Sequence, residues 1–434
     1  MIEELSKPKA ALYTLGCRLN QAETAIIANS LKEKGFTIVD SAEIADLTVI
    51  NTCTVTEQAD SKCRQAVRQS IRKNPNTFVA VIGCYAQMSV EAILAIKGVD
   101  LIIGNEHKLN LTEYLGDMKK NGQAKIIHTP KISRDSFTIK YTGLYEKQTR
   151  ANLKIQDGCN FVCSFCIIAS ARGPARSRVF KDILHEAQKF ADNGHKEIVI
   201  TGVNLGTYQY EDKKFIDVLC SLEKISGIER IRISSIEPTT VDKDLIDFMA
   251  DSKKMCRYLH IPVQSGDNDI LESMRRKHTA KDFINTIDYA YKKIPGIGIG
   301  TDVMVGYPGE TDQQFINTKK MVVDLPIAYF HIFSYSDRKG TTAYNLKPKI
   351  DPQTKKARTR IMIDVGKRQK YAYYQSFLDK EVKVLFEEKV NGFWEGFTDN
   401  YMRIQAPAAE DLHNQIRMVR LDQVNEDKIL GAIL

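Results

Sequence analysis

Three cysteines stand close together near the middle of the chain, with a spacing that can bind iron. They are Cys159, Cys163 and Cys166, in a CxxxCxxC pattern with no fourth cysteine nearby. Thiolates this close along one loop can hold three irons of a [4Fe-4S] cluster, which leaves the last iron open to an outside ligand. S-adenosylmethionine (SAM) can occupy an open iron, and an electron passed through the cluster then yields an adenosyl radical. The spacing therefore predicts radical chemistry.

A zinc site and a disulfide framework are the other common uses of clustered cysteines. Structural zinc normally takes four ligands, as CxxC pairs or as mixtures with His, and no His lies between Asp157 and Cys166. The nine cysteines among 434 residues are too sparse and odd in number for a disulfide framework. The thiols are therefore expected to belong to a reducing compartment.

Length and composition agree with a cytoplasmic enzyme of several domains. A chain of 434 residues has room for about three domains, each with its own core. Its start is charged throughout, and no apolar stretch is long enough for a membrane helix. We therefore expect a cytoplasmic protein with no membrane contact. The net charge of +8 permits a polyanionic partner without requiring one.

Residues 1–145 alternate strand-like apolar runs with amphipathic stretches, which predicts a doubly wound α/β domain. Strands are expected at 10–15, 47–51, 78–82 and 101–103, and helices at 21–33 and 58–72. Cys17, Cys53 and Cys84 each follow the end of an expected strand. Since ligands bind at the carboxyl ends of strands in open α/β sheets, these thiols can converge on one cofactor as a second three-thiolate cluster. Each can also be a plain buried residue, which is the role expected of Cys63, Cys220 and Cys256.

Residues 146–375 hold six strand-like runs separated by helical stretches, which predicts a partial (β/α)6 barrel. The strands are expected at 153–156, 198–202, 231–234, 259–263, 299–305 and 330–334, and two of the helices at 181–192 and 214–223. In such barrels the reactive groups come from the carboxyl ends of the strands. The unusual residues there are Cys159, Asn204, Ser235, Glu237, Gln264, Gly306 and Glu310. An ordinary strand-end turn is the alternative reading of each.

Residues 376–434 alternate apolar and polar side chains and turn at Asn391-Gly392, which predicts a small β-barrel. From Lys380 onward there are seven basic and ten acidic residues, poor support for a phosphate clamp. The preceding stretch, 338–374, holds eleven Lys or Arg against two Asp, with Tyr371, Tyr373 and Tyr374 at its end. We expect a basic helix there that binds RNA phosphates, with a solvated charged face as the alternative.

The cysteine motifs resemble those of a known family. The central loop, with Phe165 before its last cysteine, resembles the radical-SAM superfamily, and the N-terminal motifs are similar to those of the methylthiotransferases: 14–20 (TLGCRLN), 50–55 (INTCTV) and 81–87 (VIGCYAQ). The resemblance implies that Cys17, Cys53 and Cys84 hold an auxiliary [4Fe-4S] cluster. It implies that Cys159, Cys163 and Cys166 hold the radical-SAM cluster. It further implies SAM contacts from Phe165, Gly202, Asn204, Ser235 and Gln264.

Shorter segments indicate a branch of that family. Residues 201–208 and 233–238 resemble the branch that adds a methylthio group, with two SAM per turnover, to carbon 2 of N6-threonylcarbamoyladenosine beside the tRNA anticodon. Isopentenyladenosine or a ribosomal-protein side chain remain alternative substrates, and a non-catalytic iron-sulfur RNA-binding protein remains an alternative class. Ala169-Ser170 and His278 depart from the usual Pro-Tyr and Tyr, changes that can reshape a pocket wall. His278 is expected at an exposed helix end.

A tRNA substrate requires a basic surface, and the expected contacts come from three segments. They are Arg172, Arg176 and Arg178 beside the loop of Cys159, Cys163 and Cys166 (the radical loop), Lys367, Arg368 and Lys370 in the basic helix, and Arg403 in the C-terminal barrel. That barrel resembles the TRAM module with which such enzymes bind tRNA. Trp394 and Phe397 are candidates for base stacking or for barrel core. The expected partners are the anticodon loop of tRNA, an unidentified low-potential electron donor and an unidentified sulfur source.

Overall fold

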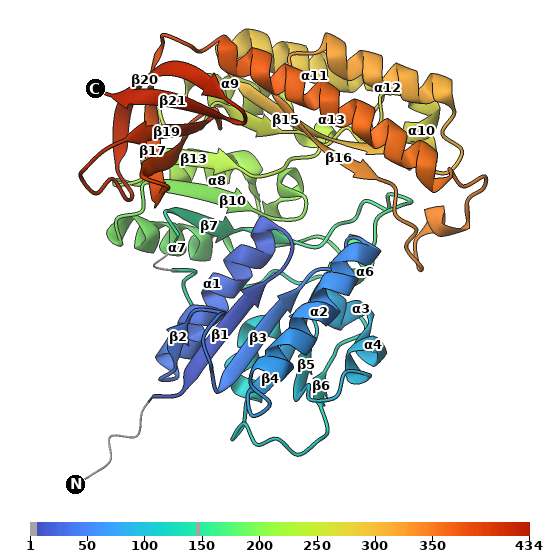
Figure 1. Cartoon of the computed structure of the whole chain (residues 1–434), viewed down its shortest axis with the longest axis vertical. Helices are drawn as coiled ribbons and strands as arrows, with labels where there is room; N and C mark the ends of the chain where they lie inside the picture. Colours follow the sequence, from blue (N-terminus) through green and yellow to red (C-terminus); the bar gives the residue numbers. More distant parts are fainter. Residues whose placement is uncertain (1–6, 145–147) are drawn as a thin grey trace.

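The structure is a computed structural model that describes residues 7–144 and 148–434. The expected domain boundary at residue 145 lies outside the described residues. An N-terminal α/β sheet lies below a curved array of central strands, and a C-terminal β-barrel packs beside that array (Figure 1). This arrangement confirms the expected α/β fold with a small terminal barrel.

The N-terminal sheet is parallel throughout, in the order β2-β1-β3-β4-β5-β6. Its strands are β1 (Lys9–Thr14), β2 (Thr37–Val39), β3 (Leu47–Thr52), β4 (Phe78–Gly83), β5 (Leu101–Ile103) and β6 (Lys125–Ile127). The helices are α1 (Arg18–Glu33), α2 (Glu57–Lys73), α3 (Cys84–Met88), α4 (Val90–Leu94) and α5 (Leu111–Tyr114), with a 3-10 turn at Lys108–Asn110.

Both faces of this sheet are buried, as a doubly wound fold requires. On one face Val49 of β3 packs in a cluster with Ile27 of α1. On the other face its neighbour Ile50 packs with Val67 of α2 and Tyr85 of α3. Successive strand residues point to opposite faces, so the continuous apolar run of β3 serves both.

The central unit is built from two three-stranded parallel sheets, in the orders β13-β10-β7 and β14-β15-β16. A bridge between Ser235 and His260 joins their edges, so the six strands form one curved array, as expected of a partial barrel. The strands are β7 (Arg150–Lys154), β10 (Glu197–Thr201), β13 (Arg230–Ile233), β14 (Tyr258–His260), β15 (Gly298–Val305) and β16 (Tyr329–Ser334).

Helices cover the outside of the array around one large apolar core. They are α7 (Phe180–Asp192), α8 (Phe215–Leu222), α9 (Lys243–Asp251), α10 (Asn268–Ser273), α11 (Ala280–Lys293) and α12 (Asp312–Asp324). Two short pairings lie outside the array: β8 (Gln156–Asp157) with β9 (Arg176–Ser177), and β11 (Gln209–Tyr210) with β12 (Lys213–Lys214). Three 3-10 turns lie at Leu205–Thr207, Pro238–Thr240 and Thr342–Asn345.

The basic stretch forms the long helix α13 (Pro352–Gln375), which Asp351 caps through its side chain. It crosses the top of the molecule and leads into the C-terminal barrel (Figure 1). That barrel is closed, in the order β17-β18-β19-β21-β20. Its strands are β17 (Glu381–Val390), β18 (Phe393–Thr398), β19 (Arg403–Pro407), β20 (Ile416–Asn425) and β21 (Lys428–Ile433).

Arginines on the central strands dock this barrel. Arg230 donates to the backbone oxygens of Phe397 and Lys383, at 2.9 and 2.8 Å. Arg232 donates to the backbone oxygen of Asp399 at 2.9 Å and pairs with the buried Glu197 at 2.6 Å. Because these guanidiniums satisfy buried carbonyls, the barrel is held in a fixed position over β10 and β13. Within the described residues, none of the helices has the length and apolar character needed to cross a membrane.

Candidate active site

The cysteines of the central loop lie between β8 and α6 (Ile168–Arg172), at the carboxyl ends of the central strands. Backbone N–H groups point at two of the sulfurs: that of Phe161 lies 3.3 Å from Cys159 Sγ, and that of Ile168 lies 3.5 Å from Cys166 Sγ. Such donors stabilise negative charge on sulfur. The loop is therefore shaped for thiolates.

Burial raises the pKa of the Cys159 thiol, and it raises the pKa of the Cys166 thiol to about 12. The nearby thiol of Cys163 adds to both shifts. The three sulfurs are thus close enough to repel one another as anions. Iron binding must displace these protons, because the thiolate is the metal ligand.

Two polar side chains complete the surroundings of this loop. Asn204 directs its Nδ2 at Cys159 Sγ, 3.9 Å away, while its buried Oδ1 has no hydrogen-bond partner among the described residues. Arg276 lies 3.6 Å from Cys163 Sγ and pairs with Glu237 at 2.6 Å. A buried amide oxygen without a partner is costly, so its place beside the sulfurs fits a bound ligand.

The remaining expected SAM contacts lie around the same edge. Gly202 has no room for a side chain, since a Cβ there would lie 2.7 Å from Leu205. Gln264 has a φ of +72°, a conformation that non-glycine residues rarely adopt. Ser235 is exposed at the end of β13, and Phe165 is half-buried against a small apolar cluster that includes Tyr307. These positions suit a ligand that crosses the strand ends.

The second cysteine triad lies at the carboxyl edge of the N-terminal sheet. Cys17 precedes α1, Cys53 follows β3 and Cys84 begins α3. Burial raises the pKa of Cys53 to about 11, and Cys84 and Cys17 add to the shift, so the three thiols face one another. Gly16 allows this approach: its φ is +103°, and a Cβ there would lie 2.7 Å from that of Cys53.

The other cysteines have structural surroundings. Cys63 is buried on α2 and its thiol donates to the backbone oxygen of Cys53 at 3.2 Å. Cys256 is buried and Cys220 is half-buried on α8. Among the described residues, only His260, Asp302 and His331 hold three potential metal-binding atoms within 4.8 Å of one another. Neither cysteine triad is that compact, which fits a multi-iron cluster better than a single tetrahedral ion.

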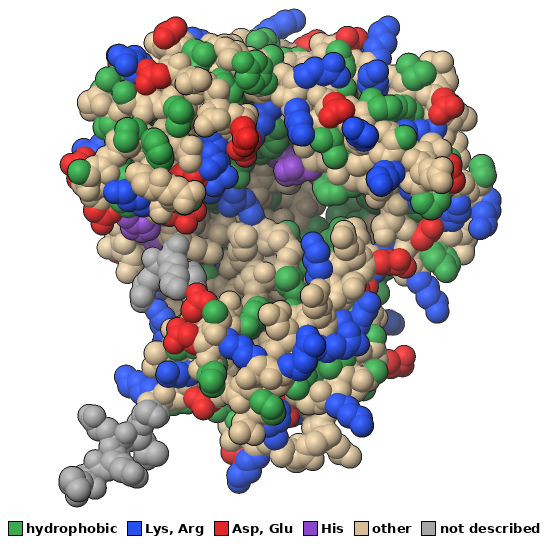
Figure 2. All heavy atoms as spheres, viewed as in Figure 1, with side chains coloured by type: hydrophobic (Ala, Val, Ile, Leu, Met, Phe, Trp, Pro, Cys, Tyr) green, Lys and Arg blue, Asp and Glu red, His purple; other side chains and the backbone are tan. Residues whose placement is uncertain are grey.

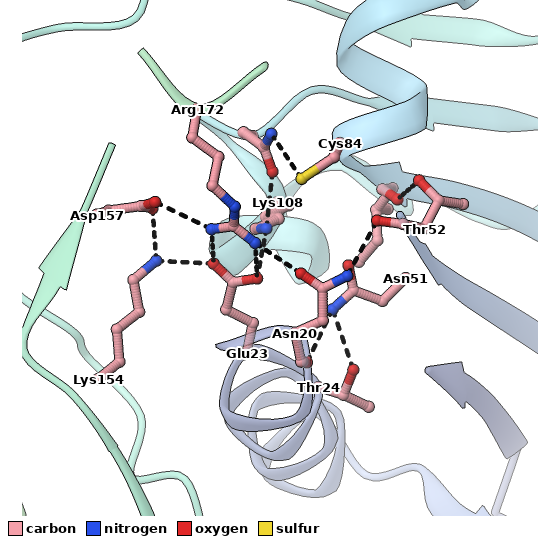
Figure 3. Close-up of polar contacts among 12 residues, drawn as sticks. Asn20, Glu23, Thr24, Asn51, Thr52, Cys84, Lys108, Lys154, Asp157 and Arg172 are labelled. Carbon is pink, nitrogen blue, oxygen red and sulfur yellow. Dashed lines mark hydrogen bonds and ion pairs between the residues drawn. The ribbon is translucent and has the colours of Figure 1, made fainter. Parts of the chain in front are cut away.

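A buried charge network lies between Cys84 of the N-terminal triad and the segment that precedes the central cysteine loop (Figure 3). Glu23 of α1 is fully buried and pairs with Arg172 of α6 at 2.9 Å, while Asp157, just before the radical loop, pairs with the same guanidinium at 2.9 Å. Lys108 and Lys154 also pair with Glu23, at 2.5 and 2.7 Å. Although burial opposes ionisation, these cations hold the pKa of Glu23 well below its usual range.

The network corrects the expected RNA contacts beside the radical loop. Arg172 and Arg178 are 2% and 1% exposed, and Arg178 pairs with Asp182 and Glu186. Arg176 pairs with Glu106 at 3.1 Å. Arg172 and Arg178 therefore neutralise internal carboxylates and cannot reach a phosphate.

One cavity of about 220 Å³ extends from the N-terminal triad to the expected SAM edge. Its lining includes Cys17 from the N-terminal triad together with Gly202 and Ser235 from the expected SAM edge. Tyr258, Tyr329 and Tyr401 form an aromatic wall, in which the rings of Tyr258 and Tyr401 lie 4.7 Å apart. The surface is hollowed between the N-terminal domain and the units above it (Figure 2).

A second, more open cavity of about 470 Å³ lies between α13, β16 and the C-terminal barrel. Its lining brings together Lys367, Lys370 and Arg403, with Tyr329 and Tyr401 shared with the first cavity. We call this second cavity the basic groove. Arg368 is exposed but does not line it, and Arg403 also pairs with Glu395.

Three expectations about single residues change. Trp394 is buried in the barrel core and its Nε1 donates to the backbone oxygen of Glu410, so it cannot stack on a base. His278 is 6% exposed rather than exposed at a helix end. Burial and Arg276 lower its pKa to about 4. Phe397 lines the basic groove and stacks on Tyr401, with ring centroids 5.0 Å apart.

Several site residues were missed by the sequence analysis. Arg18, Tyr401 and His331 line the cavity between Cys17 and the expected SAM edge. Arg18 follows Cys17 directly, a position that could have drawn attention to it. Tyr401 carries no comparable local signal, since it reaches the site from the C-terminal barrel. Glu23 lies on the helix that follows Cys17, but its partner Arg172 comes from the central unit.

Comparison with known proteins agrees with this geometry. Residues 153–322 match the Radical SAM superfamily, and residues 9–104 match a family described as "Uncharacterized protein family UPF0004". The chain is 36% identical over 424 residues to the threonylcarbamoyladenosine tRNA methylthiotransferase MtaB of Bacillus subtilis (strain 168), covering 95% of this chain and 93% of that protein. It is 30% identical to the tRNA-2-methylthio-N(6)-dimethylallyladenosine synthase of Sulfurihydrogenibium sp. (strain YO3AOP1), covering 98% and 99%.

A solved structure shows the likeness of fold. The radical S-adenosylmethionine methyltransferase TsrM of Kitasatospora setae superposes with a TM-score of 0.56 at 13% identity, covering 78% of this chain and 77% of that one. Radical-SAM membership implies a [4Fe-4S] cluster and SAM. The central cysteine loop and the partnerless oxygen of Asn204 fit these groups. Because its relatives match it over nearly their full length and its central unit matches the Radical SAM superfamily, the chain belongs to the radical-SAM methylthiotransferase family.

Proposed function

We propose that this chain is a tRNA methylthiotransferase that modifies carbon 2 of N6-threonylcarbamoyladenosine beside the anticodon. The observation that carries the proposal is the single cavity that reaches both Cys17 and the strand ends at Gly202 and Ser235. A substrate base in this cavity would lie between the two triads. Proximity of this kind replaces a bimolecular encounter with a positioned reaction.

Two cofactor sites follow from this proposal. Cys159, Cys163 and Cys166 would hold the radical-SAM cluster, with SAM against Phe165, Gly202, Asn204, Ser235 and Gln264. Cys17, Cys53 and Cys84 would hold an auxiliary [4Fe-4S] cluster. When bound, the clusters and two SAM molecules supply the adenosyl radical and the methylated sulfur. An electron donor of low potential and a sulfur source would act as partners.

The residues of the chain orient the base and exclude water. An adenine carbon–hydrogen bond is not usefully acidic, so no side-chain base can replace the radical route. The aromatic wall of Tyr258, Tyr329 and Tyr401 offers a surface on which an unstacked adenine can lie. The anticodon loop is single-stranded, which lowers the cost of extruding the base.

The basic groove supports tRNA as the substrate. Lys367, Lys370 and Arg403 line it, and Tyr401 lies in both the groove and the cavity. A phosphate backbone in the groove would therefore place a nearby base at the cavity. The proposed tRNA substrate also agrees with the expected cytoplasmic location.

Threonylcarbamoyladenosine is favoured over dimethylallyladenosine by relatedness. Identity reaches 37% for a relative named for the former, against 33% for a relative named for the latter, although the two ranges overlap. The test is mass spectrometry of tRNA nucleosides from a deletion strain and from the same strain carrying the wild-type chain or Cys159→Ala. We expect the methylthio form of threonylcarbamoyladenosine to disappear on deletion and to return only with the wild-type chain. An unchanged level of this nucleoside after deletion would refute the proposal.

A further inference from the structure

Three arginines surround the hydroxyl of Tyr401 at one end of the cavity. Burial raises the pKa of this hydroxyl, but Arg18, Arg150 and Arg232 together bring it below the ordinary value for tyrosine. Arg18 donates to Tyr401 Oη at 2.8 Å, and Tyr401 itself has a φ of +71°. This end of the cavity therefore carries a positive field, which favours an anionic ligand.

Arg18 differs from the other two arginines in its partners. Arg150 pairs with Glu387 at 2.5 Å and Arg232 pairs with Glu197 at 2.6 Å. Within residues 7–144 and 148–434, Arg18 forms no ion pair with a carboxylate. It is half-buried in the cavity lining, so its charge is partly removed from water. It shares a neighbouring hollow with Glu387 and Glu388 but forms an ion pair with neither.

The location of Arg18 adds a further cost. It is the first residue of α1, whose first turn contains no acidic side chain. A cation at a helix N-terminus opposes the helix dipole. A half-buried cation that is unfavourable for its own helix and has no carboxylate partner among the described residues points to a ligand that carries the missing charge.

The threonylcarbamoyl group supplies such a charge. Threonine is joined to it through the amino group, so the α-carboxylate is free and ionised at neutral pH. A dimethylallyl group is neutral and offers nothing to a guanidinium. Arginine binds carboxylates through two parallel N–H donors, which makes it suited to tell these two modifications apart.

We infer that Arg18 binds the carboxylate of the threonylcarbamoyl group and so selects this nucleoside against neutral N6-modified adenosines. The inference rests on the proposed function. Tyr401 acts as a positioning residue, because its hydroxyl accepts from Arg18 and its ring belongs to the aromatic wall. A guanidinium binds two anionic oxygens of one group. A phosphate of the RNA backbone offers the same pair of oxygens, so the experiment must distinguish it from the carboxylate.

The experiment uses anaerobically reconstituted protein and three anticodon stem-loops. They carry threonylcarbamoyladenosine, its threoninamide analogue, in which the carboxylate is a neutral amide, or dimethylallyladenosine. Equilibrium binding and kcat/KM are measured for the wild type, Arg18→Gln, Arg18→Lys and Arg72→Gln. Arg72 is exposed on α2, outside the lining of both cavities, and is the matched control.

We expect wild type to bind the carboxylate stem-loop roughly tenfold or more tightly than the threoninamide analogue, the size of a charged hydrogen-bonded pair. Arg18→Gln should remove this difference and leave binding of the two neutral stem-loops within about threefold. Arg18→Lys keeps the positive charge but lacks the two parallel N–H donors. Its preference for the carboxylate stem-loop should therefore lie between those of wild type and Arg18→Gln. Arg72→Gln should match wild type on all three.

The outcomes separate the inference from the function on which it rests. If wild type methylthiolates the threonylcarbamoyl stem-loop but binds its amide analogue equally well, the inference is wrong and the proposed function stands. If Arg18→Gln loses the same binding affinity for all three stem-loops, Arg18 binds a phosphate of the RNA, and this result would also overturn the inference. If wild type modifies only the dimethylallyl stem-loop, the proposed function itself fails. Iron content and circular dichroism verify that each variant is folded, and the wild-type comparison needs no variant.

Discussion

Arg172 of the radical-SAM unit donates from Nη1 to Oε1 of Glu23 of the N-terminal domain across 2.9 Å, with both side chains buried. Glu23 lies on the helix that follows Cys17, and Arg172 lies on the helix that follows Cys166. This ion pair therefore ties the helix behind one cysteine triad to the helix behind the other.

Glu23→Gln should destabilise the protein strongly. The substitution leaves Arg172, Lys108 and Lys154 buried with one carboxylate fewer, and breaking a buried ion pair on one side costs about 3–5 kcal/mol. Anaerobic thermal unfolding of the reconstituted protein measures the effect. Glu33→Gln, at the exposed end of the same helix, is the control and should shift the midpoint little. Equal midpoints for Glu23→Gln and wild type would show that the network does not hold the units together.

The basic groove should contribute to tRNA affinity without regard to sequence. Lys367→Gln combined with Lys370→Gln should weaken binding and lower the slope of log K against log salt by about 1.4–1.8, because each phosphate contact contributes about 0.7–0.9. Arg368→Gln removes the adjacent charge outside the groove and should have a smaller effect. Filter binding at several salt concentrations measures both slopes. If the Lys367→Gln/Lys370→Gln variant shows the same slope as wild type, tRNA does not lie in this groove.

His278 should make stability depend on pH. Its pKa is about 4 in the folded chain, because burial and Arg276 outweigh Asp282 and a weak backbone contact with Val263. The unfolded chain takes up this proton below about pH 6.5, whereas the folded chain does so only near pH 4. The unfolding free energy should therefore fall as pH decreases through this window, by about 1.4 kcal/mol for each unit.

The thermal unfolding midpoints at pH 7.5 and pH 5.5 measure this effect. His278→Gln removes the titrating ring and should show a smaller drop between the two conditions than wild type. His185→Gln, on an exposed face of α7, should keep the wild-type drop. A drop of the same size in His278→Gln and wild type would place the acid sensitivity elsewhere.

Much of the architecture could be predicted because it depends on local pattern. The runs at 47–51 and 78–82 are rich in apolar and β-branched residues, and each lies within a strand of the N-terminal sheet. The strand ends that carry Cys53 and Cys84 follow from the same pattern, since glycine or polar residues close each run. The closed C-terminal barrel likewise follows from alternation and the turn at Asn391-Gly392.

The accessibility of individual side chains could not be predicted in the same way. Arg172 reads as a surface cation beside the radical loop, but it pairs with the buried Glu23 of the N-terminal domain. Arg178 pairs with Asp182 and Glu186 of the helix that follows it. Trp394 lies in the barrel core because the closed barrel covers it with side chains of other strands, such as Val384 and Val419. Such outcomes depend on which units dock together, and local spacing carries no information about that.

The proposed function requires two three-thiolate clusters that divide the chemistry between them. The most direct test compares Cys17→Ala with wild type after anaerobic reconstitution, measuring iron content, deoxyadenosine formation and methylthio transfer to the threonylcarbamoyl stem-loop. With two [4Fe-4S] clusters, wild type should bind about eight irons. Cys17→Ala should lose up to about four of these irons and all methylthio transfer, yet still cleave SAM. Cys220→Ala should behave as wild type. Methylthio transfer at the wild-type rate in Cys17→Ala, or about four irons in wild type, would contradict the account.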